Sequence, residues 1–339
     1  MTLLATEPAT IPLPTIDGVR RALSEIRPFQ PETPLVQSVL LSEAFGAEVW
    51  LKNETVSPIG CFKLRGALVD LLRATSGKTR RRIVTSSSGN HGQGVAYAGR
   101  ILGLAVTVFL PSTANAIKRA TIYALGAEIR LVPGDSYSVK LEAQRYALDN
   151  DCYFVDDGDC INLAEGAGTV GLEIADALES IDAVFLPVGD AALINGAGSA
   201  LKAICPYVEI IGVQALGAPA YAYSHRSGAA VDYPVKTIAD GLATRKPTPS
   251  ALNGMKAFVD RFVLVEENEM LSAIHSLAIA GHILAEPSGA ATLAAAWKDR
   301  HQWSGKKIAL VVSGSNIEPQ VLVQAVQATP LWPLPKNPV

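Results

Sequence analysis

The stretch SPIGCFKLRGA (residues 57–67) places one lysine at the junction between a loop and a predicted helix. Apolar residues recur at helical intervals over residues 62–72, so Lys63 lies at the start of that helix, closely flanked by apolar residues and glycines. An amine that is partly desolvated and near another cation, such as Arg65, has a lowered pKa and becomes a nucleophile toward a carbonyl group. The competing interpretation is a surface lysine at the start of an ordinary helix.

The composition is that of a globular protein with one large core or, as we expect, two lobes. The chain has 339 residues, 49% of them hydrophobic, and a formal net charge of -3. Apart from a short basic run at residues 78–82, no segment is rich in lysine and arginine, which argues against nucleic acid or a membrane surface as the main partner. No apolar run has the length of a membrane span, and residues 1–14 do not resemble a secretory leader, so we expect a cytoplasmic protein.

The cysteines indicate a reducing compartment. Cys61, Cys152, Cys160 and Cys205 form no CxxC pair, which argues against a disulfide framework or a structural zinc site. We expect Cys61 to be a small, buried packing residue.

Alternating strand and helix patterns run through the chain and predict parallel sheets. Predicted strands cover residues 48–52, 82–85, 105–110, 128–132, 153–155, 183–188, 209–213, 262–265 and 308–312. Predicted helices cover residues 16–26, 42–45, 62–72, 93–102, 117–125, 138–147, 168–178, 193–204, 269–280 and 287–297, and residues 219–234 are expected to be irregular.

Two turns between a strand and a helix are rich in small residues. The first is SSSGNHG (residues 86–92) and the second is PVGDAALING (residues 187–196). Such turns present several backbone N–H groups at a helix N-terminus, where they bind anions, and in a doubly wound sheet they gather at the carboxyl ends of the strands. A carboxylate or phosphate is therefore expected there, although the first turn alone is also compatible with a simple helix cap.

Taken together, these motifs resemble the fold-type II pyridoxal-phosphate enzymes, in particular the threonine/serine dehydratase and serine racemase group. The resemblance covers nearly the whole chain, and its markers keep their order and spacing. They are TPL (33–35), GCFKLRGA (60–67), SSGNHGQG (87–94), PVG (187–189), ADG (239–241), EPSGA (286–290) and SGSN (313–316). The resemblance implies a two-lobed α/β architecture like that of the tryptophan synthase β subunit, in which each lobe is a mostly parallel twisted sheet flanked by helices. Residues 1–81 and 155–339 would form a large cofactor-binding domain, and residues 82–154 a small mobile domain that closes over substrate.

The resemblance also implies a role for individual residues. Lys63 would hold pyridoxal 5'-phosphate as a Schiff base, Phe62 would lie beside its ring, Asn90 would bind the ring 3-oxygen and Ser313 would meet the pyridine nitrogen. The substrate carboxylate would bind at Ser87, Ser88, Asn90 and His91, and the cofactor phosphate at Gly189, Asp190, Ala191, Ala192 and Leu193.

The implied activity is α,β-elimination from a β-hydroxy-α-amino acid, giving a 2-oxo acid and ammonia. Threonine and serine are the expected substrate type, with 3-hydroxyaspartate and phenylserine also considered. One alternative is an amino-acid racemase that uses Lys63 and Ser88 on opposite faces of the substrate. Another is a non-catalytic homologue that binds cofactor or amino acid. The group also suggests a homodimer.

Two departures from the group's pattern carry further expectations. The phosphate turn, commonly four glycines, reads Gly189-Asp190-Ala191-Ala192 here, so we expect mostly negative φ angles, with Asp190 facing the protein and capping a local N–H. The stretch QALGAPA (residues 214–220) lacks the carboxylates of the racemase metal site, so no metal is expected.

Overall fold

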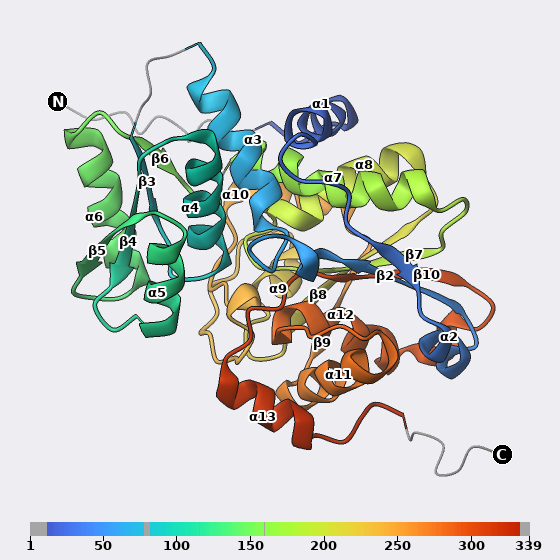
Figure 1. Ribbon diagram of the computed structural model, residues 1–339. Coiled ribbons are helices and arrows are strands. Elements are labelled where there is room, and N and C mark those ends of the chain that lie inside the picture. The colour runs from blue at the N-terminus through green and yellow to red at the C-terminus, as the bar shows by residue number, and fades with distance from the viewer. Residues whose placement is uncertain (1–11, 78–81, 115, 159, 333–339) are drawn as a thin grey trace.

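The structure, a computed structural model, describes residues 12–77, 82–114, 116–158 and 160–332. Its strands form two separate sheets, each covered by helices on both faces (Figure 1). The predicted α/β class with mostly parallel sheets is confirmed. Most of the basic run at residues 78–82 lies outside the described residues.

The larger sheet has six strands in the order β1 (Leu35–Gln37), β2 (Glu48–Asn53), β10 (Lys307–Val312), β7 (Ala183–Pro187), β8 (Glu209–Ala215) and β9 (Arg261–Val265). Only the β1–β2 pair is antiparallel. The last strand, β10, lies in the middle, with Ile308 opposite Val49 on one side and Ala183 on the other. The sheet is therefore completed by the two ends of the chain.

Two apolar cores cover the faces of this sheet. Helices α7 (Ile161–Ala177), α8 (Ala192–Ile204) and α10 (Pro249–Phe258) pack on one face, and α2 (Val39–Phe45), α11 (Glu267–Ala280) and α12 (Pro287–Lys298) on the other. Both faces of β7, β8 and β10 are buried, as is usual for parallel strands with a near-continuous apolar sequence. Helix α1 (Ile16–Ile26) packs against α7, and α13 (Pro319–Gln327) against α11.

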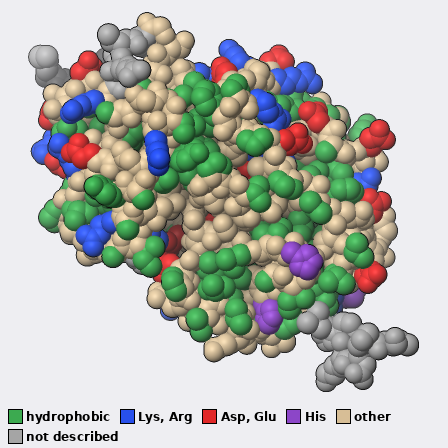
Figure 2. All heavy atoms as spheres, viewed as in Figure 1, with side chains coloured by type: hydrophobic (Ala, Val, Ile, Leu, Met, Phe, Trp, Pro, Cys, Tyr) green, Lys and Arg blue, Asp and Glu red, His purple; other side chains and the backbone are tan. Residues whose placement is uncertain are grey.

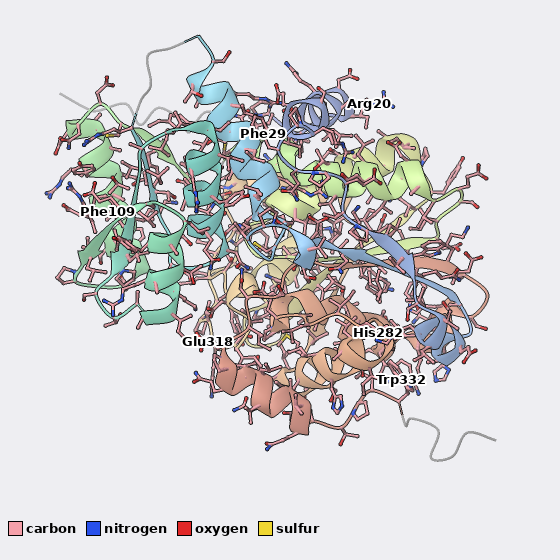
Figure 3. The ribbon with its side chains drawn as sticks, viewed as in Figure 1. Arg20, Phe29, Phe109, His282, Glu318 and Trp332 are labelled. Carbon is pink, nitrogen blue, oxygen red and sulfur yellow. The ribbon has the colours of Figure 1, made fainter. Side chains whose placement is uncertain are left out.

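The smaller sheet has four parallel strands in the order β5 (Glu128–Val132), β4 (Val106–Pro111), β3 (Ile83–Ser86) and β6 (Tyr153–Val155). Helices α4 (Asn90–Leu102) and α5 (Ala116–Ala124) cover one face, and α6 (Ser136–Asp149) covers the other. On the α6 side, Phe109 packs against Tyr146 with ring centroids 5.3 Å apart (Figure 3). Helix α3 (Lys63–Thr75) contacts both α4 and α7, so it lies at the seam between the two layered units.

The observed elements follow most of the predicted ones, but β1, α10 and α13 were not predicted. Two further differences are informative. Helix α7 begins at Ile161, seven residues before the predicted start, because its glycines permit close helix contacts and do not break the helix. A Cβ on Gly166 would lie 2.6 Å from the Arg65 carbonyl oxygen, and one on Gly171 2.6 Å from Ala197 Cα. Residues 219–234, expected to be irregular, contain helix α9 (Ala220–Ser227).

Two features are absent from the described residues, a membrane-spanning helix and a cluster of metal-binding side chains. Within residues 12–332 as described, no helix has the length and apolarity to cross a bilayer, and no cluster of His, Cys, Asp and Glu is arranged to hold a metal ion. Positive and negative side chains are interspersed on the face shown in Figure 2. All four cysteines are free, and Cys61 is fully buried, as predicted.

Candidate active site

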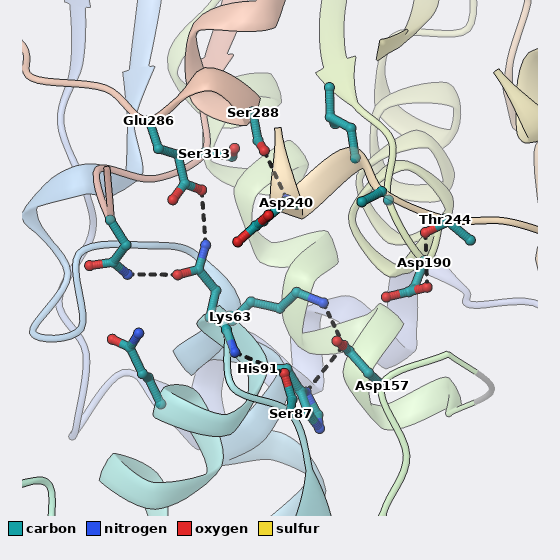
Figure 4. A pocket seen from close by; sticks show the side chains of 18 of the residues that line it. Lys63, Ser87, His91, Asp157, Asp190, Asp240, Thr244, Glu286, Ser288 and Ser313 are labelled. Carbon is teal, nitrogen blue, oxygen red and sulfur yellow. Dashed lines mark hydrogen bonds and ion pairs between the residues drawn. The ribbon is translucent and has the colours of Figure 1, made fainter. Parts of the chain in front are cut away.

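A cavity of about 580 Å³ lies where the carboxyl ends of strands from both sheets converge (Figure 4). Residues that follow β3, β6, β7 and β10 line it, which is the usual position of ligand sites in parallel sheets. The lining includes Phe62, Lys63, Ser87, Asn90, His91, Asp157, Gly189, Asp190, Ala191, Ala192, Leu193, Glu286 and Ser313. Segments far apart in the chain thus supply one site.

Lys63 is the first residue of α3, and the loop before it is fixed by the segment after β10. Phe62 N–H donates to the Ser313 carbonyl (3.1 Å), Ser315 N–H donates to the Gly60 carbonyl (2.8 Å), and Cys61 forms an isolated bridge with Gly314. Gly60 has φ +69°, a conformation in which a side chain is strained. The lysine side chain, 19% exposed, extends from this fixed loop into the cavity.

The surroundings of Lys63 differ from the predicted ones. Its ammonium pairs with Asp157, whereas Arg65 is fully buried among Glu54, Glu173 and Thr33. Burial by itself lowers the pKa of Lys63, but the negative charges of Asp157 and Asp190 outweigh it and raise that pKa above its usual value. The expected lowering by Arg65 is therefore wrong for this state of the site.

The side-chain amide of Asn90, at the start of α4, is held by two hydrogen bonds. Its Nδ2 donates to Glu286 Oε1 at 2.9 Å, and its Oδ1 accepts from Asn316 Nδ2 at 2.6 Å. Asn316 also donates to the Ile59 carbonyl, so the network joins α4 to the loop before Lys63. Ser313 is buried beside this network and lines the cavity.

Glu286 provides a test of this network through the pH dependence of stability. Burial, reinforced by Asp240, raises the pKa of Glu286 to about 7, although the hydrogen bond from Asn90 opposes the shift. The folded state binds this proton more tightly than the unfolded chain does, so its stabilising effect is complete below the unfolded pKa of 4.5 and is lost as pH rises toward 7. We therefore expect Glu286→Gln to gain roughly 3 kcal/mol relative to wild type between pH 4.5 and 8, measured by urea unfolding. A pH-independent difference would contradict this assignment.

The loop from Gly189 to Leu193 leads from β7 into α8. A Cβ on Gly189 would lie 2.2 Å from the Gly241 carbonyl oxygen, so only glycine fits there. Of the residues in the turn 189–192, only Ala191 has a positive φ angle, +66°, so the expectation of mostly negative φ angles is confirmed, and Ala191 is the exception where the turn into α8 takes the left-handed conformation. Asp190 lines the cavity and accepts from the Thr244 hydroxyl at 3.2 Å, so the expectation that it faces the protein and caps a backbone N–H is wrong.

Ser87, Ser88 and His91 of the first turn take different positions relative to the cavity. Ser87 lines the cavity, and its hydroxyl accepts from Gly89 N–H at 3.2 Å. Ser88 is partly buried but is not among the lining residues. His91 is buried at the cavity wall, and its ring lies between Thr85 and Asp157.

The comparisons with known proteins agree with this geometry. The family model described as "Pyridoxal-phosphate dependent enzyme" matches residues 26–314. The chain belongs to the pyridoxal-phosphate-dependent enzymes. An L-threonine ammonia-lyase of Thermotoga maritima is 35% identical over 306 residues, which are 90% of this chain and 76% of that protein. A catabolic L-threonine dehydratase of Staphylococcus aureus is 33% identical over 309 residues, covering 90% of this chain and 89% of that one.

Solved structures place this pyridoxal-phosphate enzyme in the fold-type II group. Maize serine racemase superimposes with a TM-score of 0.87 at 28% identity, covering 93% of this chain and 98% of that one. A threonine deaminase from Solanum lycopersicum superimposes with a TM-score of 0.85 at 29% identity, covering 96% of this chain and 93% of that one. The predicted group and the lyase class are confirmed.

The cavity of this pyridoxal-phosphate enzyme fits its cofactor. A lysine amine, an amide and a buried hydroxyl converge from Lys63, Asn90 and Ser313, and the N-terminus of α8 supplies backbone N–H groups for a phosphate at Gly189 to Leu193. Gly189 lies so close to the Gly241 carbonyl oxygen that a side chain at position 189 would not fit in this phosphate loop. Asp190 is the one acidic residue in the loop, and burial together with Asp157 raises its pKa, which favours the uncharged acid beside an anion.

Two residues of this pyridoxal-phosphate enzyme's site, Asp157 and Glu286, were not predicted from sequence as site residues. Glu286 belongs to the EPSGA motif, which pointed to the family but not to a role for this residue. Asp157 lies two residues beyond β6, and an acidic residue near the carboxyl end of a parallel strand is the signal that would have found it.

Proposed function

We propose that this enzyme eliminates the β-hydroxyl group of an α-amino acid of the threonine or serine type, giving a 2-oxo acid and ammonia. The observation that best supports the proposal is that the Lys63 amine lies in a cavity between two turns. The backbone N–H groups of these turns can each bind an anion, one at either end of the cavity. The names of the threonine ammonia-lyase and dehydratase relatives support it.

The chain's residues suit the proton transfers of this reaction. Bound pyridoxal phosphate supplies the electron sink that makes the α-proton acidic. With the cofactor bound, Lys63 freed by the substrate amine would be a neutral amine and would take that proton at Nζ as the Cα–H bond breaks. The Cα–H electron pair would form the Cα–Cβ double bond, and the β-oxygen would leave with the C–O pair as hydroxide, which takes a proton from solvent to become water. Ser313 carries no charge to stabilise a long-lived carbanion, which suits prompt loss of the β-substituent.

The test is a panel of L-serine, L-threonine, 3-hydroxyaspartate and phenylserine. Release of a 2-oxo acid from one of them, with ammonia in equal amount, is the expected result. No 2-oxo acid from any of the four would contradict the proposal.

Racemisation is the second candidate, and the similarity to maize serine racemase favours testing it. A two-face mechanism needs Ser88 opposite Lys63, yet Ser87 and not Ser88 lines the cavity. The geometry therefore supports elimination more strongly. Chiral chromatography of unreacted substrate would show D-enantiomer exceeding oxo acid if racemisation dominates.

We further propose that residues 82–154 form a domain that closes over substrate while residues 1–81 and 155–339 hold the cofactor. Lys118 on α5 crosses between the two units and pairs with Asp240 and Glu318. Glu318 lies at the start of α13, on the side of that helix toward the smaller sheet (Figure 3). These ion pairs supply contacts that a closed form would use.

A homodimer in the cytoplasm is part of the same proposal. Val36, Val39 and Leu40, on and next to α2, are 56%, 69% and 44% exposed, and such apolar side chains suit a subunit interface. The four free cysteines suit a reducing compartment. Analytical ultracentrifugation tests the assembly.

Asp190 offers a test of cofactor binding in this loop. A carboxylate a few ångströms from a phosphate costs roughly 1–4 kcal/mol, and the raised pKa of Asp190 limits this cost at low pH. We therefore expect Asp190→Asn to bind pyridoxal phosphate about tenfold more tightly than wild type at pH 8.5, and the difference to become smaller as the pH is lowered. Asp156→Asn, a change outside the cavity lining, should bind like wild type at every pH measured. Equal affinity of wild type and Asp190→Asn at pH 8.5 would contradict the repulsion.

A further inference from the structure

Asp157 has no role in the proposed elimination, yet it contacts the reactive lysine. It lies two residues beyond β6, its side chain is 27% exposed, and one oxygen, Oδ1, faces both Lys63 Nζ and His91 Nδ1 (Figure 4). The His91 contact measures 3.1 Å. A single carboxylate oxygen therefore joins the catalytic amine to a buried imidazole.

The hydrogen bonds of His91 fix the orientation of its ring. Thr85 donates its hydroxyl proton to the Val155 carbonyl at 2.9 Å, and the Thr85 oxygen lies 3.0 Å from His91 Nε2. The other ring nitrogen, Nδ1, faces the carboxylate of Asp157. His91 is therefore held between Thr85 and Asp157, and it holds the Asp157 carboxylate in turn.

The charges around Asp157 come from three elements. Lys63 faces it from α3, His91 from α4, and Asp190 from the loop before α8. Burial opposes ionisation of Asp157, but His91 and Lys63 outweigh it and lower its pKa well below the usual range. Around Lys63 itself lie Asp157, Asp190 and the Cys61 thiol. Asp157 is therefore the ionised carboxylate of the pair that it forms with Asp190.

We propose that Asp157, held in place by His91, is a positioning residue that directs the Lys63 amine into the cavity and stabilises its ammonium form when that amine is not bonded to cofactor. Free Lys63 arises twice: before the cofactor is loaded, when it rests as the ammonium, and after the substrate amine has displaced it, when it is released as the neutral amine. In the second case Lys63 Nζ gains the α-proton as the Cα–H bond breaks, and Asp157 stabilises the resulting ammonium without taking a proton. The inference rests on Lys63 being the cofactor lysine of the proposed function.

The test measures the reactivity of Lys63 directly and needs no substrate. The full-length chain, freed of cofactor, is labelled with trace acetic anhydride between about pH 7 and pH 12, because the pKa of Lys63 is raised, and acetylation of the Lys63 peptide is followed by mass spectrometry. In Asp157→Asn the amine loses its counter-ion, so the labelling midpoint should move to lower pH and the rate at pH 7.5 should rise several-fold. Asp156→Asn, whose carboxylate pairs with Lys140 at 2.7 Å, is the matched control and should leave the midpoint unchanged.

A second variant separates this role from a general packing role. His91→Ala removes the hydrogen-bond partner that holds Asp157 in place, so the Lys63 midpoint should move to lower pH, as in Asp157→Asn but by less. This variant also carries the test if circular dichroism shows that Asp157→Asn is unfolded. An unchanged midpoint in folded Asp157→Asn, or in folded His91→Ala, overturns the proposal. A failed substrate panel with the expected labelling shifts would instead refute only the proposed reaction.

Discussion

Lys63→Ala is expected to lower kcat by more than about 10³-fold, since general-base catalysis alone contributes roughly 10²–10⁴-fold and this variant also loses the covalent attachment point of the cofactor. The visible absorbance of the lysine-bound cofactor should disappear with it. Both quantities are measured on purified protein with saturating pyridoxal phosphate.

Lys140→Ala is the matched control for this result. Lys140 lines the same cavity but pairs with Asp156, so this variant should retain the lysine-bound absorbance. A Lys63→Ala protein that turns over substrate at the wild-type rate would remove the basis of the proposed function.

The second large effect is expected at Arg65, where Arg65→Ala should destabilise the protein by about 3–5 kcal/mol. The guanidinium is fully buried and donates to Glu54, Glu173, Thr33 and Thr169 at 2.8–3.1 Å. Removing it leaves two buried carboxylates, with Lys52 as the remaining buried cation beside Glu173. Urea unfolding of wild type and variant measures the loss.

A surface arginine gives the comparison. Arg145 pairs with Glu142 on the exposed side of α6 with 68% of its side chain accessible, so Arg145→Ala should cost less than about 1 kcal/mol. If the two variants lose similar stability, the buried cluster around Arg65 contributes no more to stability than an exposed ion pair, which contradicts the expected effect.

The order of strands and helices was predictable because most of the parallel strands are short apolar runs that alternate with helical patterns. The first residues of the helices were less predictable. Gly166 and Gly171 look like helix breakers in sequence, but their role depends on how closely α7 approaches α3 and α8, which is a tertiary property. The short antiparallel β1 carries no periodic signal over its three residues.

For the site, sequence motifs identified Lys63, Asn90 and Ser313, which the structure brings to one cavity. Side-chain direction could not be predicted in the same way. Arg65 is two residues from Lys63 in sequence, yet it points into a buried ion cluster, and the partner of the amine, Asp157, is 94 residues away. Sequence proximity to a cation therefore gave the wrong direction for the pKa of Lys63.

The central position of β10 has a consequence for biosynthesis. At roughly 5–20 residues per second, the ribosome makes residues 307–312 more than about ten seconds after residues 48–53, and until then β2 and β7 have no strand between them. Ser313 and the loop that fixes Lys63 emerge only with this strand. A pocket for the vitamin-derived group therefore cannot form before residues 307–316 have been made, and a nascent polypeptide that stalls earlier offers it none.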